Sequence, residues 1–284
     1  MLQALVNGIT DGLLIGLMAL GVSLVYVVQR FPNVSHGGLV AAGAYATYAY
    51  GRFLDSWYLA IAAGVLTAFG LGALCYWFVI RPFRTAPLMT LLIVTVGLEF
   101  VLDNTIALIW GSSLRTYGFG VAGEFAPGGV HVSKAAVYTS LVALATMAVV
   151  AVVIGRTGLG RDMRALSDDR SLARVAGISE NRTLMLTWGL VGVPAAIAGV
   201  CLGVKSQLTP LMGWNLLLPS FAAAILGGLG GFGGAILGGV LVGVGMEVFT
   251  LAFPAVFKPV FAFVLITLLL LARPQGLLGK AVRV

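Results

Sequence analysis

The sequence predicts an all-α, polytopic integral membrane bundle of about eight or nine spans, some of them broken or re-entrant. Two observations carry this prediction. Hydrophobic residues form 60% of the 284-residue chain and charged residues only 10%, and the apolar residues fall in runs of about 20, the length of a membrane-spanning helix. A soluble domain of this length could not cover so much apolar surface with so few charges. The composition therefore excludes a soluble enzyme, a disordered protein and a nucleic-acid binder.

The apolar runs predict the spans in chain order, within one transmembrane domain that covers 1–284. Long runs cover roughly 3–28, 57–80, 87–110, 135–155 and 184–205, and further runs cover 214–228, 232–253 and 256–272. One short segment, 37–51, is either a span or a re-entrant piece. The 39 glycines favour close helix packing, because small residues let membrane helices approach each other. Two glycine ridges have a four-residue spacing: Gly8, Gly12 and Gly16, and Gly230, Gly234 and Gly238.

The basic residues predict the orientation of the spans. Cytoplasmic loops of membrane proteins are rich in Lys and Arg, and 12 of the 17 basic residues lie in four segments between or after the spans. These segments hold Arg30, then Arg81 and Arg84, then the six arginines of 156–182, and finally Arg273, Lys280 and Arg283. We expect all four segments, and the C-terminus, on the cytoplasmic side. Segment 111–134 is then the longest external connection, and it is either a docking surface for an external partner or a solvated connector.

The polar segment 156–182 predicts a short amphipathic helix. Ser167 is the expected N-cap, Asp168 and Asp169 favour the first turn, and Gly177 suits the position after the last turn. A few residues would suffice to join two spans. The helix is therefore expected either to enter a groove on a soluble partner or to lie on the membrane surface.

Several motifs, in their order along the chain, resemble the branched-chain amino acid ABC transporter permease family of the LivH type. The cytoplasmic coupling loop of ABC importer permeases is similar to ALSDDRSLARVAGIS. The first span of the family is similar to NGITDGLLIGLMALGVSLVYVV, and its asparagine–histidine–glycine motif to FPNVSHGGLVAAGAYA. The Gly-rich C-terminal spans are similar to AAAILGGLGGFGGAILGGVLVGVGMEVF, and the closing motif to ARPQGLLGK. The resemblance covers essentially the full length.

This resemblance implies an importer subunit in a bacterial-type inner membrane, surrounded by lipid. It implies a homologous permease subunit as partner (a second copy or a LivM-like chain), two cytoplasmic ATPase subunits, and a periplasmic or lipid-anchored substrate-binding protein. ATP and Mg would be bound by the ATPase subunits, because the chain lacks a Gly-x4-Gly-Lys-Ser/Thr phosphate loop. We expect no catalytic residue, metal site or cofactor in the chain itself, and no nucleic-acid partner. The residues expected to couple to the ATPase are Ser167, Asp168, Asp169, Arg170, Leu172, Ala173, Arg174 and Gly177.

Polar groups inside the spans predict a substrate path, since ionisable groups are costly there. Glu99 and Asp103 lie one turn apart on one helix face, where they would either line a path for a substrate's ammonium group or join helices. Asp11 and Glu247 also lie in predicted spans. Each is a candidate for the path.

Two breaks in the apolar pattern point to the same path. Pro32 and the glycines after His36 cause the first break. A half-helix that begins near Ser35 would therefore point its positive end at an anion. The second break, from Gln207 to Pro219, stands at a similar place in the second half. The residues expected along the path are Asn33, Ser35, His36, Gly37, Glu99, Asp103, Gln207 and Glu247.

The expected cargo is a branched-chain or other apolar amino acid, carried by alternating access. One alternative keeps the architecture but imports urea, short amides, or aromatic or other carboxylates. A second is an ion-coupled secondary transporter in which the carboxylates of the spans form a relay, and a third is a scaffold. Asp11, Ile15 and the pair Val34-Ser35 depart from the family pattern and leave the cargo open.

Overall fold

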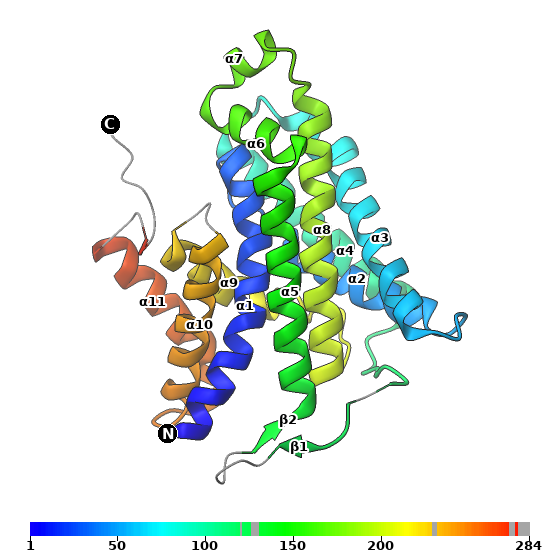
Figure 1. Cartoon of the computed structure of the whole chain (residues 1–284), viewed down its shortest axis with the longest axis vertical. Coiled ribbons are helices and arrows are strands. Elements are labelled where there is room, and N and C mark those ends of the chain that lie inside the picture. Colours follow the sequence, from blue (N-terminus) through cyan, green and yellow to red (C-terminus); the bar gives the residue numbers. More distant parts are fainter. Residues whose placement is uncertain (120, 126–130, 229–231, 273–275, 278–284) are drawn as a thin grey trace.

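The computed structural model of the protein describes residues 1–119, 121–125, 131–228, 232–272 and 276–277. These residues form a bundle of α-helices, which confirms the predicted fold class (Figure 1). The helices are α1 (Leu2–Gln29), α2 (His36–Tyr50), α3 (Trp57–Leu74), α4 (Leu88–Trp110), α5 (Lys134–Arg156), α6 (Gly158–Asp168), α7 (Arg170–Val175), α8 (Glu180–Lys205), α9 (Trp214–Gly227), α10 (Phe232–Phe249) and α11 (Lys258–Ala272). A π-helical turn, η1 (Cys75–Ile80), and a 3₁₀ turn, η2 (Arg81–Phe83), extend α3, and η4 (Ala255–Phe257) precedes α11. The two short strands β1 (Glu124–Phe125) and β2 (Val132–Ser133) pair antiparallel.

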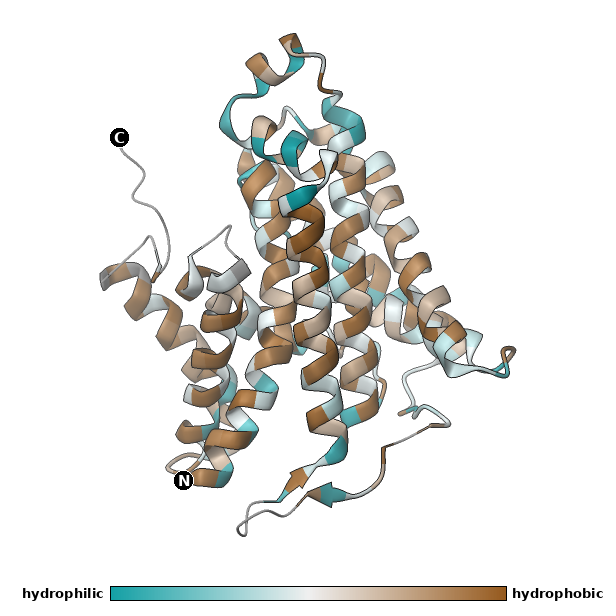
Figure 2. Cartoon of the chain, in the orientation of Figure 1, coloured by the Kyte–Doolittle hydropathy of each residue, from teal (hydrophilic) through white to brown (hydrophobic). Residues whose placement is uncertain are grey.

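Five helical segments are long and apolar enough to cross a membrane: α1, α3 with its two turns, α4, α5 and α8. Figure 2 shows hydrophobic residues along these helices and hydrophilic residues gathered at the ends of the bundle. Helix α2 has 15 residues and α9 has 14, so each is only about 20 Å long, against a hydrocarbon core of about 30 Å. Helix α2 is therefore too short to cross the membrane. It is a half-helix, as expected if segment 37–51 is a re-entrant piece and not a span.

Helix α1 forms the centre of the bundle and packs along α10, with no room for side chains between the two backbones. A Cβ atom on Gly12 would lie 2.7 Å from the Gly239 carbonyl oxygen, and one on Gly16 would lie 2.9 Å from the Ala235 carbonyl oxygen. The first predicted glycine ridge is thus a helix contact. Gly238 of the second ridge faces α9 instead, against Ala223, and Gly230 lies outside the described residues.

Three arginine-bearing segments meet at one end of the bundle. Figure 1 places α6 and α7 beyond this end, while the N-terminus and the β1–β2 pair lie at the opposite end. Arg30 donates to the Ser167 carbonyl oxygen over 3.1 Å, and Arg84 donates to the Asn181 side chain over 3.0 Å. The prediction that these segments share one side is confirmed. Residues 278–284 lie outside the described ranges, so the side of the C-terminus stays a prediction.

The long connection between α4 and α5 is tied to the bundle at several points. Arg115 and Leu208 exchange two backbone hydrogen bonds, of 3.2 and 2.7 Å. The Tyr117 hydroxyl donates to the Ala44 carbonyl oxygen over 3.0 Å, and the Phe119 and Trp57 rings lie 4.4 Å apart. The described part of this loop therefore covers the ends of α2, α3 and α8, and its docking to an external partner stays a prediction.

Candidate functional site

The first break in the helical pattern ends where α2 begins, deep in the bundle. Before it, the Ser35 backbone N–H and hydroxyl both donate to the Asn33 side-chain oxygen, over 3.1 and 2.7 Å. Asn33, Ser35 and His36 are fully buried. The His36 ring lies against Gly21 of α1 so closely that a Cβ atom there would clash with it. The half-helix near Ser35 that the sequence predicts is thus present, and a local Asn–Ser turn sets its start.

The group at the N-terminus of α2 is the carboxyl side chain of Glu99, from α4 of the same chain. The Gly38 backbone N–H, in the first turn of α2, donates to Glu99 Oε2 over 2.5 Å, and the side chain of Glu99 is fully buried. Helix N-termini attract negative charge because their N–H groups lack intrahelical partners. Asp103 is buried one turn further along α4, and its carboxylate has no hydrogen-bond partner among the described residues.

The two predicted breaks meet in space. Gly37 at the start of α2 lies against Gly213, which precedes α9, and a Cβ atom on Gly37 would lie 3.0 Å from the Gly213 carbonyl carbon. The second break is shorter than the sequence predicts. Pro219 lies inside α9 and does not end the break. A proline removes only one backbone donor, and the helix begins at Trp214 and continues through it.

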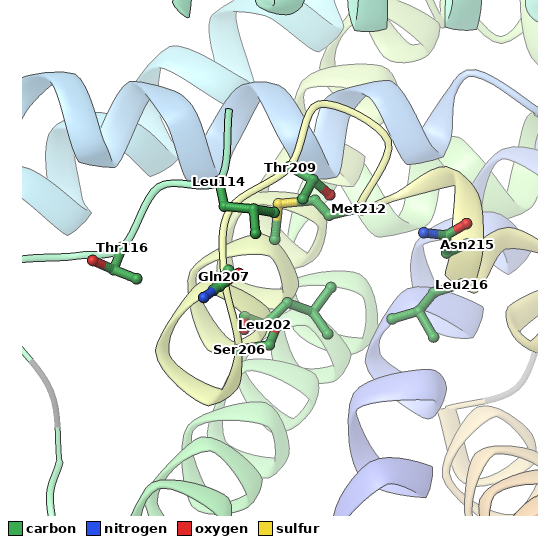
Figure 3. A pocket seen from close by; sticks show the side chains of 9 residues that line it. All are labelled: Leu114, Thr116, Leu202, Ser206, Gln207, Thr209, Met212, Asn215 and Leu216. Carbon is green, nitrogen blue, oxygen red and sulfur yellow. Dashed lines mark hydrogen bonds between the residues drawn. The ribbon is translucent and has the colours of Figure 1, made fainter. Parts of the chain in front are cut away.

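Gln207, the path residue predicted in the second break, lines an open cleft of about 730 Å³ at the end opposite α7. Figure 3 shows its lining: Leu114 and Thr116 from the long loop, Leu202, Ser206, Gln207, Thr209 and Met212 from the end of α8 and the second break, and Asn215 and Leu216 from α9. Asn33, His36 and Asp103 do not line this cleft. The predicted path residues are therefore divided between a buried junction and an outer cleft.

A second cleft, of about 310 Å³, shares Leu202, Ser206 and Leu216 with the first. Two ion pairs lie in its wall: Lys205 with Asp11, and Lys258 with Glu247. The sequence does not predict these pairings. The available signal is weak: each lysine stands at the end of a span, where a long side chain can reach back toward a carboxylate. Within the described ranges, no three His, Cys, Asp or Glu side chains gather as a metal site would require.

At the other end, the segment 156–182 forms two helices where one was expected. Ser167 lies in the last turn of α6 and is not an N-cap; its hydroxyl donates to the Val27 carbonyl oxygen over 2.9 Å. Asp168 ends α6 and does not begin a helix. The N-cap is Asp169, whose side chain accepts from the backbone N–H groups of Ser171 and Leu172 over 2.7 and 3.0 Å. Three hydrogen bonds lower the pKa of the Asp169 carboxyl. The bond from the Ser171 hydroxyl has the largest effect, and the two backbone bonds add to it.

Helix α7 ends at Val175, and Gly177 stands after its last turn, as the sequence predicts. Gly177 has φ +83°, its N–H donates to the Arg174 carbonyl oxygen, and the Ile178 N–H donates to that of Ala173. This pair of bonds is a Schellman motif, which favours glycine. Leu172 and Val175 are 69% and 87% exposed on the outer side of the helix. Helix α7 thus presents apolar side chains at the polar end of the bundle.

Arg170 attaches α7 to the helices of the bundle. Its guanidinium donates to the Val28 carbonyl oxygen at the end of α1 over 3.0 Å, and it lies 3.6 Å from the Glu180 carboxylate at the start of α8. Together with the bonds of Ser167 and Arg30, these contacts satisfy carbonyl groups that the end of a helix leaves unpaired. A displacement of α7 would therefore move the ends of α1 and α8.

Comparison with known proteins identifies the family. The family model described as branched-chain amino acid transport system / permease component matches residues 4–272. The high-affinity branched-chain amino acid transport system permease protein BraD of Pseudomonas aeruginosa is 32% identical, with 98% of this chain and 96% of BraD covered. LivH of Escherichia coli, described as a permease protein of the same kind of system, is 29% identical, with 98% of this chain and 96% of LivH covered.

A solved structure shares the fold. The inward-facing conformation of a putative metal-chelate type ABC transporter has a TM-score of 0.53 and 16% identity, with 95% of this chain and 87% of that chain covered. At this identity the likeness concerns the fold alone. The match to the family model over nearly all of the sequence shows that the chain belongs to the family of permease components of branched-chain amino acid transport systems.

Proposed function

We propose that the chain is the permease subunit of an ATP-driven importer for branched-chain or other apolar amino acids in the inner membrane. The observation that carries this proposal is the family match over residues 4–272. The chain supplies no bond chemistry in this proposal. ATP and Mg are bound by two cytoplasmic ATPase subunits, a homologous permease subunit completes the membrane part, and a substrate-binding protein delivers the cargo to the opposite end.

Helix α7 has the features of the docking element for an ATPase subunit. Its exposed Leu172 and Val175 stand at the polar end of the bundle, beyond the last turn of α1 and the first turn of α8. Apolar side chains exposed together at such a place favour a protein interface. The N-cap Asp169 and the stop at Gly177 define the two ends of the six-residue helix α7, and Arg170 and the buried Ala173 hold it against the bundle.

The contacts of α7 give a route from the docking end to the middle of the membrane. Arg170 of α7 and Ser167 of the adjoining α6 hold the end of α1, and α1 is followed by the buried turn at Asn33 and by α2. The N-terminus of α2 is fixed to Glu99 of α4 and packs against Gly213 before α9. ATP-driven movement of α7 would shift this junction and expose the path alternately to each side.

The test is the ATPase activity of the complete complex in lipid nanodiscs, with binding protein loaded with leucine. Leu172→Asp combined with Val175→Asp is expected to prevent co-purification of the ATPase subunits or to abolish stimulation by the loaded binding protein. Phe83→Asp is the control, because it also places a negative charge on an exposed apolar residue at the same end, but outside α7. Normal stimulation of the double variant would contradict the role of α7.

Two other outcomes would identify the alternatives. Stimulation only by binding protein loaded with urea, an amide or another carboxylate would keep the importer and change its cargo. Failure to co-purify any ATPase, with leucine uptake driven by an ion gradient, would overturn the proposal. The buried Asp103, whose carboxylate has no hydrogen-bond partner among the described residues, would then be the first candidate for an ion relay.

A further inference from the structure

We propose that the cleft walled by Asp11, Lys205, Glu247 and Lys258 is a binding site for the zwitterionic head of an apolar amino acid. This inference rests on the proposed function and deepens it, because it names the groups that would recognise the cargo. The substrate carboxylate replaces a carboxylate partner of a lysine, and the substrate ammonium group binds the carboxylate that is released.

The walls of the cleft combine charge with apolar surface. The cleft has a volume of about 310 Å³, at the small end of the range for ligand sites, roughly 300–1,000 Å³. Beside the two ion pairs, its lining is mainly aliphatic: Leu14, Ile15, Leu202, Leu216 and Met246. A small molecule with an aliphatic side chain and a charged head matches both parts of this lining.

The arrangement of the charges favours a zwitterion over a simple ion. The four side chains form two ion pairs, each of one lysine and one carboxylate, so their charges cancel. A ligand with one positive and one negative group can exchange partners with a pair and leave every charge matched. An amine or a carboxylate alone would break a pair and leave one of its charges without a partner, so it would gain less than a zwitterion.

The four charged residues come from four different helices. Asp11 lies on α1, Lys205 ends α8, Glu247 lies on α10, and Lys258 begins α11. The Asp11–Lys205 pair joins the two helices whose other ends hold α7 through Arg170. Opening this pair by a substrate would loosen α1 from α8 at the outer end, so binding and the position of α7 would be linked.

The first experiment separates recognition of substrate from a merely structural ion pair. Leucine uptake and ATP hydrolysis are measured in parallel in proteoliposomes with the complete importer and leucine-loaded binding protein. Asp11→Leu combined with Lys205→Leu removes the pair. Asp11→Lys combined with Lys205→Asp keeps the pair but reverses its direction. For both variants we expect normal assembly, with leucine uptake per ATP reduced at least about tenfold.

Wild-type uptake per ATP in the reversed variant would show that the pair only joins α1 to α8, and would overturn the inference. Wild-type uptake in the double-leucine variant would overturn it as well. The proposed function fails in a different way, because leucine-loaded binding protein would then not stimulate ATP hydrolysis even in the wild type.

A second measurement tests binding directly and does not depend on the reversed variant. Ser206 is exposed and lines both clefts, whereas the native Cys75 and Cys201 are buried. The rate at which a charged, membrane-impermeant thiol reagent labels Ser206→Cys is measured in the complete importer, with the wild type as control. We expect leucine to slow labelling, and 4-methylpentanoate or 3-methylbutylamine at the same concentration not to do so. Equal protection by all three compounds, or no protection by leucine, would overturn the inference.

Discussion

The Glu99 carboxylate accepts a hydrogen bond from the backbone N–H of Gly38, a residue 61 positions earlier in the chain. This bond fixes the N-terminus of the half-helix α2 to the middle of the spanning helix α4. The buried Gly38 N–H would otherwise lack a partner, because the first turn of a helix has no earlier turn to supply a carbonyl acceptor. Glu99 therefore has a structural partner whether or not it also faces a substrate.

Glu99→Ala is expected to lower the free energy of unfolding by about 1–3 kcal/mol, the cost of leaving a buried donor without its acceptor. Glu99→Gln keeps an acceptor oxygen and should fall between Ala and the wild type. The measurement is denaturant-induced unfolding in detergent. Asp103→Asn is the matched control, on the same helix face one turn away, and it should not destabilise the protein, since the Asp103 carboxylate has no hydrogen-bond partner in the described ranges. Equal stability of Glu99→Ala and the wild type would contradict the capping role.

Gly213→Ala is expected to disrupt the junction of the two breaks. Its Cβ atom would lie 2.8 Å from the Gly37 Cα atom and closer still to that residue's carbonyl group, all of it backbone that no rotamer change can move. We expect a destabilisation of about 1–3 kcal/mol, as for other overpacked sites, and loss of leucine uptake. Gly97→Ala is the control, because an added Cβ atom there meets nothing within 4 Å, and alanine favours a helix by up to about 1 kcal/mol over glycine. If Gly213→Ala matched the wild type in thermal unfolding and in leucine uptake, the close contact at this junction would not be needed.

The sequence predicts those parts of the site that depend on residues close together along the chain. Pro32 and the glycines after His36 are local signals, and they locate the start of α2 correctly. The partner of that helix, Glu99, lies in another span, and Lys205 lies 194 residues from Asp11. Pairings over such distances depend on how the helices pack, which no local pattern encodes.

The error at Ser167 has the same origin. Ser167 and Asp169 are both good N-cap residues, so the local sequence does not decide between them. The Val27 carbonyl oxygen at the end of α1 accepts the Ser167 hydroxyl, which leaves the cap to Asp169. A tertiary contact therefore determines which residue caps α7. The segment that the sequence predicts as one helix forms α6 and α7.

Asp169→Ala is expected to unfold α7 locally. It removes the acceptor for the N–H groups of Ser171 and Leu172, and hydrogen exchange of the amides of 171–175 should become faster. Asp169→Asn keeps an acceptor oxygen and should preserve protection. Because the pKa of Asp169 is lowered in the folded protein, the cap is intact at neutral pH and weakens only as pH falls through that lowered pKa. Unchanged exchange in Asp169→Ala, or loss of protection between pH 6 and 8 in the wild type, roughly the range where histidine titrates, would contradict this account.

Arg170→Met is expected to separate ATP hydrolysis from transport. The substitution keeps much of the aliphatic length of the side chain but removes the bonds to the Val28 carbonyl oxygen and the Glu180 carboxylate. Hydrogen bonds to charged groups contribute about 1.5–3 kcal/mol, so leucine uptake per ATP should fall at least about tenfold. Binding of the ATPase subunits should persist, because Leu172 and Val175 remain exposed. Arg161→Met is the control, since Arg161 is exposed on α6 and its side chain makes no hydrogen bond or ion pair with the described residues. Uptake per ATP that drops equally in both variants would mean that the net charge of this end matters, and that the link from α7 to α1 and α8 does not.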